Sequence, residues 1–160
     1  MVDILTATPD DWAMVRDVRL RALADSPDAF SVTLPQARAQ PEEVWRDRLA
    51  GPQPTLVAVH DGNGVGMGGG FAAPDDATRA WVWGMWTDPA FRGRGVGSRV
   101  LDDLVDWARA AGRTPYLHVT EGNDGARALY VTRGFTSTGA WSPLREGSPL
   151  RIEEMVLRRG

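Results

Sequence analysis

The stretch FRGRGVGSRV, residues 91–100, places three glycines and three arginines within ten positions and then continues into an apolar helical pattern. Glycines between a strand and a helix expose consecutive backbone N–H groups, and such groups at a helix N-terminus bind anions. Arg92 and Arg94 add donors for charge-assisted hydrogen bonds. The stretch therefore predicts either an anion site or a tight strand-to-helix turn with solvated arginines.

Two common phosphate motifs do not match this stretch. Gly93, Gly95 and Gly97 follow the spacing G-x-G-x-G, whereas the dinucleotide fingerprint needs G-x-G-x-x-G and would have a glycine in place of Ser98. The acidic residue that should follow about 20 positions later is also missing, because Asp106 comes too early and lies in the expected helix. The Walker loop requires a lysine, and the chain contains none.

The composition is that of one domain spanning residues 1–160, with 42% hydrophobic residues and a net charge of −3. The negative charge argues against nucleic acid as a partner. No apolar run reaches the roughly 18 residues of a membrane span, and the N-terminus lacks the pattern of a secretory signal, so we expect a cytoplasmic protein that does not bind membranes. With no cysteine and only two histidines, we expect no metal site.

Hydrophobic periodicity and turn residues predict an α/β (α+β) domain in which helices cover both faces of a mixed, mostly antiparallel sheet of six to seven strands. The glycine-rich stretch joins an aromatic strand to an amphipathic helix that ends at Gly112. Expected strands are residues 1–5, 55–60, 65–73, 81–86, 114–119, 135–140 and 150–157, and expected helices lie between Thr8 and Pro27 and over residues 41–49, 97–111 and 123–133.

Two segments together carry a family resemblance. The spacing Arg92-x-x-Gly95-x-Gly97 resembles motif A of the GNAT N-acetyltransferase superfamily, whose pattern is Gln/Arg-x-x-Gly-x-Gly/Ala. The segment LHVTEGNDGARALYVTRGF, residues 117–135, resembles the second signature of that family. Its matching positions are Asn123, Ala126, Leu129, Tyr130, Gly134 and Phe135. The two signatures cover residues 81–135, and the order of elements agrees over nearly the whole chain, so the resemblance implies a GNAT-like acyl-CoA N-acyltransferase fold.

The resemblance implies acetyl-CoA as cosubstrate. In the family, the loop N–H groups hold the pyrophosphate, and the pantetheine arm lies in a cleft where two parallel strands splay apart. Pantetheine carries two amides, for which an unpaired strand edge offers partners. The positions that the resemblance implies for cofactor binding are Met85, Trp86, Thr87, Arg92, Gly93, Arg94, Gly95, Val96, Gly97, Ser98, Asn123, Ala126 and Tyr130.

The resemblance also implies catalytic roles. Tyr130 corresponds to the family's general acid for the departing thiolate, and a phenol is protonated at pH 7; the alternative is a ring packed in the core. A backbone N–H, that of Met85, would stabilise the oxyanion. Glu121 is the leading candidate for the general base, with a solvated loop carboxylate, His118 or an ordered water chain as alternatives. Asn123 is expected either to contact the cofactor or to cap the following helix.

The acceptor is expected to be a primary amine of a small molecule or a peptide. Aromatic residues either line its pocket or pack in the core: Trp45, Trp81, Trp83, Trp86, Trp141 and Phe30. Alternation along a strand places Trp81 and Trp83 on one face and Trp86 on the other, so these three are not expected to line one pocket. The alternative functions are a protein N-terminal or lysine acetyltransferase and a non-catalytic acyl-CoA-binding module. The family also provides precedents for a homodimer.

Overall fold

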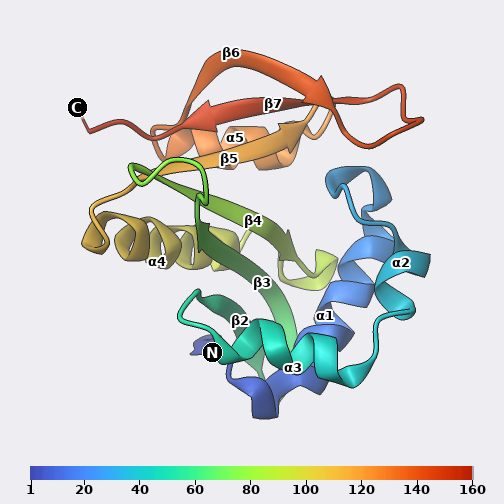
Figure 1. Ribbon diagram of the computed structural model, residues 1–160. Helices are drawn as coiled ribbons and strands as arrows, with labels where there is room; N and C mark the ends of the chain where they lie inside the picture. The colour runs from blue at the N-terminus through green and yellow to red at the C-terminus, as the bar shows by residue number, and fades with distance from the viewer. Residues whose placement is uncertain (160) are drawn as a thin grey trace.

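A computed structural model describes residues 1–159 and contains a seven-stranded sheet in the order β1-β2-β3-β4-β5-β7-β6 (Figure 1). All neighbouring strands are antiparallel except β4 and β5. The predicted mixed, mostly antiparallel sheet is therefore confirmed. The strands are β1 (Asp3–Thr6), β2 (Thr55–His60), β3 (Asn63–Ala72), β4 (Arg79–Thr87), β5 (Thr114–Thr120), β6 (Thr136–Pro143) and β7 (Arg151–Val156).

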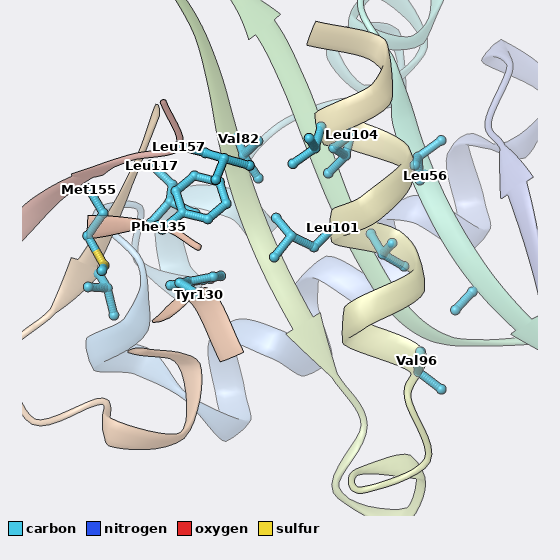
Figure 2. Packing of buried hydrophobic residues seen from close by; sticks show 14 of the residues in the cluster. Leu56, Val82, Val96, Leu101, Leu104, Leu117, Tyr130, Phe135, Met155 and Leu157 are labelled. Carbon is cyan, nitrogen blue, oxygen red and sulfur yellow. The ribbon is translucent and has the colours of Figure 1, made fainter. Parts of the chain in front are cut away.

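Helices cover both faces of the sheet, as expected. One buried cluster joins α1 and α3 to the sheet, and the other joins α4 and α5 to its opposite face. Figure 2 shows the second cluster, in which Leu101 and Leu104 of α4 lie against the strands. The helices are α1 (Trp12–Asp25), α2 (Leu34–Arg38), α3 (Glu42–Ala50), α4 (Val96–Ala110) and α5 (Asp124–Thr132).

The N-terminal half differs from expectation in two places. The first helix begins at Trp12, because a short 3-10 turn over Pro9–Asp11 precedes it, and the Asp11 carboxylate accepts from the backbone N–H of Thr8 at 2.8 Å. Helix α2 is absent from the prediction. Thr33 caps it: the Thr33 hydroxyl accepts from the N–H of Gln36, and the Gln36 side chain accepts from the N–H of Thr33.

The two parallel strands separate partway along their length. β4 pairs with β5 over four residue pairs, from Arg79–Thr114 to Val82–Leu117. Beyond these pairs β4 continues to Thr87 and β5 to Thr120 without further pairing, and Figure 1 shows the two ends diverging. The sheet thus has a wedge-shaped gap at the carboxyl ends of β4 and β5, directly before the glycine-rich loop.

The expected strict alternation along β4 is wrong. The register with β3 shifts between Met67 and Gly69, and opposite this shift Gly84 has a φ of +67°, a conformation that favours glycine. This β-bulge brings Trp83 and Trp86 to the same face, where both pack against the α1 cluster. Between Trp83 and Trp86, β4 has one residue more than the facing part of β3. This extra residue reverses which face of the sheet the following side chains of β4 occupy.

The glycines of β3 permit close packing by α4. A Cβ at Gly68 would lie 2.5 Å from the Met85 sulfur, 2.9 Å from Cγ1 of Val100 and 3.0 Å from Cδ1 of Leu104. We therefore expect Gly68→Ala to lower the free energy of unfolding by about 1–3 kcal/mol, the usual cost of overpacking. Gly51→Ala is the matched control, because a Cβ there has nothing within 4 Å. Urea denaturation of both variants measures the difference, and equal midpoints would contradict this packing.

Candidate active site

The glycine-rich loop begins at a capped turn and ends at a helix N-terminus. The Asp88 carboxylate accepts from the N–H of Ala90 at 2.8 Å and starts the turn over Pro89–Phe91. Gly95 is the N-cap of α4 with a φ of +79°, which favours glycine. Within residues 1–159, none of the backbone N–H groups of residues 93–98 donates a hydrogen bond to another protein group. Free N–H groups at a helix N-terminus are suited to binding an anion.

The two loop arginines lie differently from the expectation that both serve an anion. The Arg92 guanidinium is 2.7 Å from the Asp25 carboxylate and also donates to the carbonyl of Thr87 at 2.9 Å. The guanidinium of Arg94 lies over the Phe91 ring, 5.1 Å from its centroid. Arg92 therefore ties the loop to the end of α1.

The Asp25 carboxylate accepts hydrogen bonds from three side chains. It accepts from Trp86 Nε1 at 3.0 Å, from the Ser26 hydroxyl at 2.7 Å and from Arg92. The hydrogen bond from Trp86, followed by those from Ser26 and Arg92, holds the pKa of the Asp25 carboxyl below its usual value. The side chains of β4 and of the loop are thus held in place by α1.

A groove of about 490 Å³ runs along this loop and is called the loop groove below. Every residue predicted to bind cofactor lines it except Arg94. Its lining residues are Ser26, Ala29, Met85, Trp86, Thr87, Phe91, Arg92, Gly93, Gly95, Val96, Gly97, Ser98, Asn123, Gly125, Ala126, Leu129 and Tyr130. The groove runs from the free N–H groups of the loop to the end of β4, which still pairs with β3 but no longer with β5.

The prediction missed five of these lining residues. Leu129 and Gly125 lie within the second signature, and Leu129 shares a helix face with Ala126 and Tyr130, so the spacing of that helix contained a signal for it. Phe91 begins the glycine-rich stretch itself. Ser26 and Ala29 come from the end of α1, about sixty residues away in the chain, where no local pattern indicates the groove.

Tyr130 is both a core residue and a groove residue. Its side chain is 5% exposed, and its ring packs edge-on against Phe135 with centroids 6.1 Å apart (Figure 2). No group among residues 1–159 makes a hydrogen bond with its hydroxyl, and burial raises the pKa of that hydroxyl above its ordinary value. A neutral phenol therefore borders the groove at every pH near neutrality.

Asn123 combines the two roles considered for it. Its side-chain oxygen accepts from the N–H of Ala126 at 3.4 Å and caps α5. The same residue lines the loop groove.

Glu121 lies in a different environment from the one that its predicted role requires. Its carboxylate accepts from the backbone N–H of Arg151 at 2.9 Å and from the Arg151 guanidinium at 3.2 Å. The backbone hydrogen bond and then the side-chain bond lower the pKa of Glu121. Glu121 does not line the loop groove. Each of these features weakens Glu121 as a base.

A second hollow of about 720 Å³, called the aromatic hollow below, lies on the other side of the splayed strands. Of the aromatic residues considered for an acceptor pocket, Phe30, Trp45, Trp81 and Trp83 line it. Trp86 lines the loop groove instead. Trp141 is 43% exposed on β6 and lies under the Arg151 guanidinium, so it lines neither hollow.

A small space of about 40 Å³, called the throat below, shares lining residues with both hollows. It shares Met85, Asn123, Ala126 and Tyr130 with the loop groove. It shares Phe30, Val82, Trp83, Gly84, His118 and Thr120 with the aromatic hollow. The throat lies where β4 and β5 separate, and each hollow shares part of its lining.

His118 borders the throat and the aromatic hollow. Its ring stacks on Trp81 with centroids 4.6 Å apart and an interplanar angle of 16°. Desolvation lowers the pKa of the imidazole, and the nearby Glu154 opposes this effect. The neutral imidazole is therefore favoured at pH 7, and its nitrogen lone pair can accept a proton.

No group of three or more metal-ligating side chains is gathered anywhere in residues 1–159. In the same part of the chain, no helix has the length and hydropathy needed to cross a bilayer.

Comparisons of the sequence give consistent matches. The model of the acetyltransferase (GNAT) family matches residues 20–135. The mycothiol acetyltransferase of Beutenbergia cavernae is 34% identical over 119 residues, which are 72% of this chain and 38% of that protein. That of Thermomonospora curvata is 35% identical over 140 residues, 84% of this chain and 44% of that protein. The N-alpha-acetyltransferase RimI of Mycobacterium tuberculosis is 50% identical over 52 residues, 32% of each chain. Each match covers less than half the length of the curated relative.

Solved structures share the fold. The acetyltransferase of the GNAT family from Streptococcus pneumoniae superposes with a TM-score of 0.81 at 23% identity and covers 98% of each chain. A Salmonella typhimurium protein solved with its cofactor acetyl-CoA has a TM-score of 0.79 at 21% identity, and the match covers 100% of this chain and 96% of that one.

Proposed function

Since the chain belongs to the acetyltransferase (GNAT) family, we propose that it transfers the acetyl group of acetyl-CoA to a primary amine of a small molecule or peptide. One observation carries this proposal. The free N–H groups of residues 93–98 lie in a groove that leads along the end of β4 that no longer pairs with β5 to the throat beside Tyr130. An anion site, a strand edge and a neutral acid are thus aligned in the order that the parts of acetyl-CoA require.

Different regions of the groove are suited to the pyrophosphate, the pantetheine arm and the thioester of acetyl-CoA. Its pyrophosphate would accept from the loop N–H groups of residues 93–98, with the dipole of α4 behind them. The pantetheine amides would pair with the backbone of Met85–Thr87, where β4 has left β5. The thioester would then lie in the throat, which Met85 and Tyr130 both line. The Salmonella typhimurium relative solved with acetyl-CoA supports this assignment.

The reaction proceeds by direct attack in the throat. The amine nitrogen attacks the thioester carbonyl carbon, so that a C–N bond forms and the C–S bond breaks. A backbone N–H of the splayed part of β4, that of Met85, stabilises the negative charge on the carbonyl oxygen. Tyr130 gives its proton to the departing thiolate, and the nitrogen loses one proton to a base.

We assign the role of base to His118 in preference to Glu121. His118 borders the throat and the aromatic hollow from which the amine would enter, and its lowered pKa keeps it neutral at pH 7. Glu121 is held by Arg151 outside both hollows. A base must be unprotonated and within reach of the amine, and His118 fits both conditions better.

The experiment that tests the proposed function measures release of the free thiol from acetyl-CoA with a panel of amines, amino acids and peptides. We expect acceptor-dependent release, with an acetylated amine formed in equal amount by mass spectrometry. Absence of release with every acceptor would contradict the proposal and would favour a non-catalytic acyl-CoA-binding module. The same assay in His118→Gln tests the base: its rate should fall, and the acid limb of the pH profile caused by imidazole protonation should disappear.

The relatives do not agree on one acceptor. Two are named mycothiol acetyltransferase and one N-alpha-acetyltransferase. The acceptor of this chain must therefore be inferred from its own aromatic hollow.

A further inference from the structure

Arg19 lacks an ion-pair partner in residues 1–159 and lies against aromatic rings. Its guanidinium lies between two rings, 4.7 Å from the centroid of Phe30 and 5.5 Å from that of Trp83. Its Nη1 is buried without a hydrogen-bond partner, and no carboxylate among residues 1–159 forms an ion pair with the guanidinium. Desolvation, and secondarily Arg48, lowers the pKa of Arg19 to about 10, so it still carries its charge at pH 7. The two aromatic faces stabilise this charge, and no acceptor in residues 1–159 pairs with Nη1.

Thr120 provides a second, independent observation. Its Oγ1 and Nη1 of Arg19 are the two buried side-chain polar atoms without a partner in residues 1–159. Both residues line the aromatic hollow, although they come from β5 and α1 on different sides of it. Buried polar atoms normally have partners. Both unpartnered atoms therefore belong to residues that line one hollow.

The hollow carries more positive than negative charge. Arg48 lines it together with Arg19, and its guanidinium lies over Trp45, 5.4 Å from the ring centroid, without an ion-pair partner in residues 1–159. Asp47 is the acidic residue of the lining, and His118 is neutral at pH 7. Two guanidinium groups beside aromatic walls are suited to a planar anionic group attached to an apolar body.

We propose that the aromatic hollow binds an acceptor in which the reacting amine and a carboxylate belong to one small molecule, with Arg19 and Arg48 binding the carboxylate. This inference rests on the proposed function and names its substrate class. The hydroxyl of Thr120 supplies a further hydrogen bond to the polar end of the acceptor. The rings of Phe30, Trp81 and Trp83 contact its apolar part.

The position of Arg19 limits the distance between the amine and the carboxylate. Its Nη1 lies 3.4 Å from the place that a Cβ of Gly84 would occupy, and Gly84 lines the throat one residue before Met85. A carboxylate at Arg19 is therefore close to the thioester that the amine must reach. This geometry fits an amino acid or a similar amino carboxylate. A peptide N-terminus fits less well, because its first carboxyl group has become a neutral amide.

Binding without turnover tests the proposal directly. Calorimetry with free coenzyme A present compares phenylalanine with phenylalaninamide and leucine with leucinamide. Each pair differs only at the carboxyl group. We expect the wild-type protein to bind each acid about 10- to 100-fold more tightly than its amide, the range for a hydrogen-bonded charge pair.

Arg19→Met removes the charge and keeps a long apolar side chain between the two rings. This variant should bind the acid and the amide with about equal affinity. Arg19→Lys should retain part of the preference for the acid. Arg16→Met is the matched control, because Arg16 belongs to the same helix and lines neither hollow. Its preference should equal that of the wild type. Circular dichroism of all variants verifies their folding.

Three results would decide the matter. Equal binding of acids and amides by the wild-type protein would overturn the proposal. A loss of affinity for both in Arg19→Met, with the preference intact, would also overturn it, because it would show a packing role alone. A preference for acids in a protein that releases no thiol with any amine would support the site and contradict the proposed transferase function.

Discussion

Gly95→Asp is expected to lower the affinity for coenzyme A by about 100-fold or more. Gly95 is the N-cap of α4, beside the N–H groups that are proposed to hold the pyrophosphate. A carboxylate there would oppose the charge of the phosphates, and two unit charges 4 Å apart interact by about 4 kcal/mol near a protein surface. It would also accept hydrogen bonds from the same N–H groups and so compete with the ligand.

Gly95→Asn tests the effect of the shape of the new side chain without its negative charge. Asparagine has nearly the same shape as aspartate, and both tolerate the φ of +79° better than most residues. A Cβ at Gly95 has no atom within 4 Å, so neither side chain should disturb the packing of the loop. We expect Gly95→Asn to lose affinity by about tenfold at most. Calorimetry with coenzyme A measures both variants, and equal affinities for the two would contradict an anion site at this helix N-terminus.

Tyr130→Phe is expected to lower kcat by about 100- to 1,000-fold, within the usual contribution of general acid–base catalysis, with little change in the affinity for acetyl-CoA. The ring contributes to the core through Phe135, and phenylalanine preserves that packing. The hydroxyl has no protein partner in residues 1–159, so its removal leaves no unpaired group behind. The variant should therefore lose the proton donor and retain the fold.

Stopped-flow measurement of thiol release, together with calorimetry, tests this variant. Unchanged kcat would remove Tyr130 from the reaction, and a parallel loss of coenzyme affinity would indicate a binding role instead. The pH profile adds a second criterion. Because burial raises the pKa of Tyr130 above its ordinary value, the wild-type rate should show no alkaline limb from this group up to pH 9.5. An alkaline limb below that pH that disappears in Tyr130→Phe would support the general-acid role and contradict the raised pKa.

The features that the sequence predicted correctly depend on local signals. Glycine spacing, helix periodicity and turn residues are read over a few positions, and they identified the loop before α4, the helix that carries Tyr130 and the order of the strands. The strand from Thr55 to His60 has exactly the predicted bounds. The contribution of residues 85–87 and 123–130 to one groove came from the family resemblance, because no local pattern joins two distant segments.

The features that escaped prediction depend on contacts between distant segments. The bulge at Gly84 reverses the alternation of β4, and its signal is a register shift against β3 that a single strand does not reveal. Arg19 appears in the sequence as an ordinary helix residue, since only the packing of Phe30 and Trp83 makes it a buried charge. Likewise, the pairing of Glu121 with Arg151 brings together residues thirty positions apart. The expected homodimer stays a prediction.

The short pairing between β4 and β5 has a consequence for cooperativity. In residues 1–159, the strand pairing between the unit of β1–β4 and the unit of β5–β7 comprises four residue pairs. Arg145 adds hydrogen bonds to the carbonyls of Pro27, Phe30 and Ser31. Regions with few shared backbone bonds open with a lower free energy than the rest of a domain. A coenzyme bonded to both units would oppose that opening, by about 2.7 kcal/mol at a concentration 100 times its dissociation constant. The thermal stability of this sheet would then rise with the concentration of acetyl-CoA.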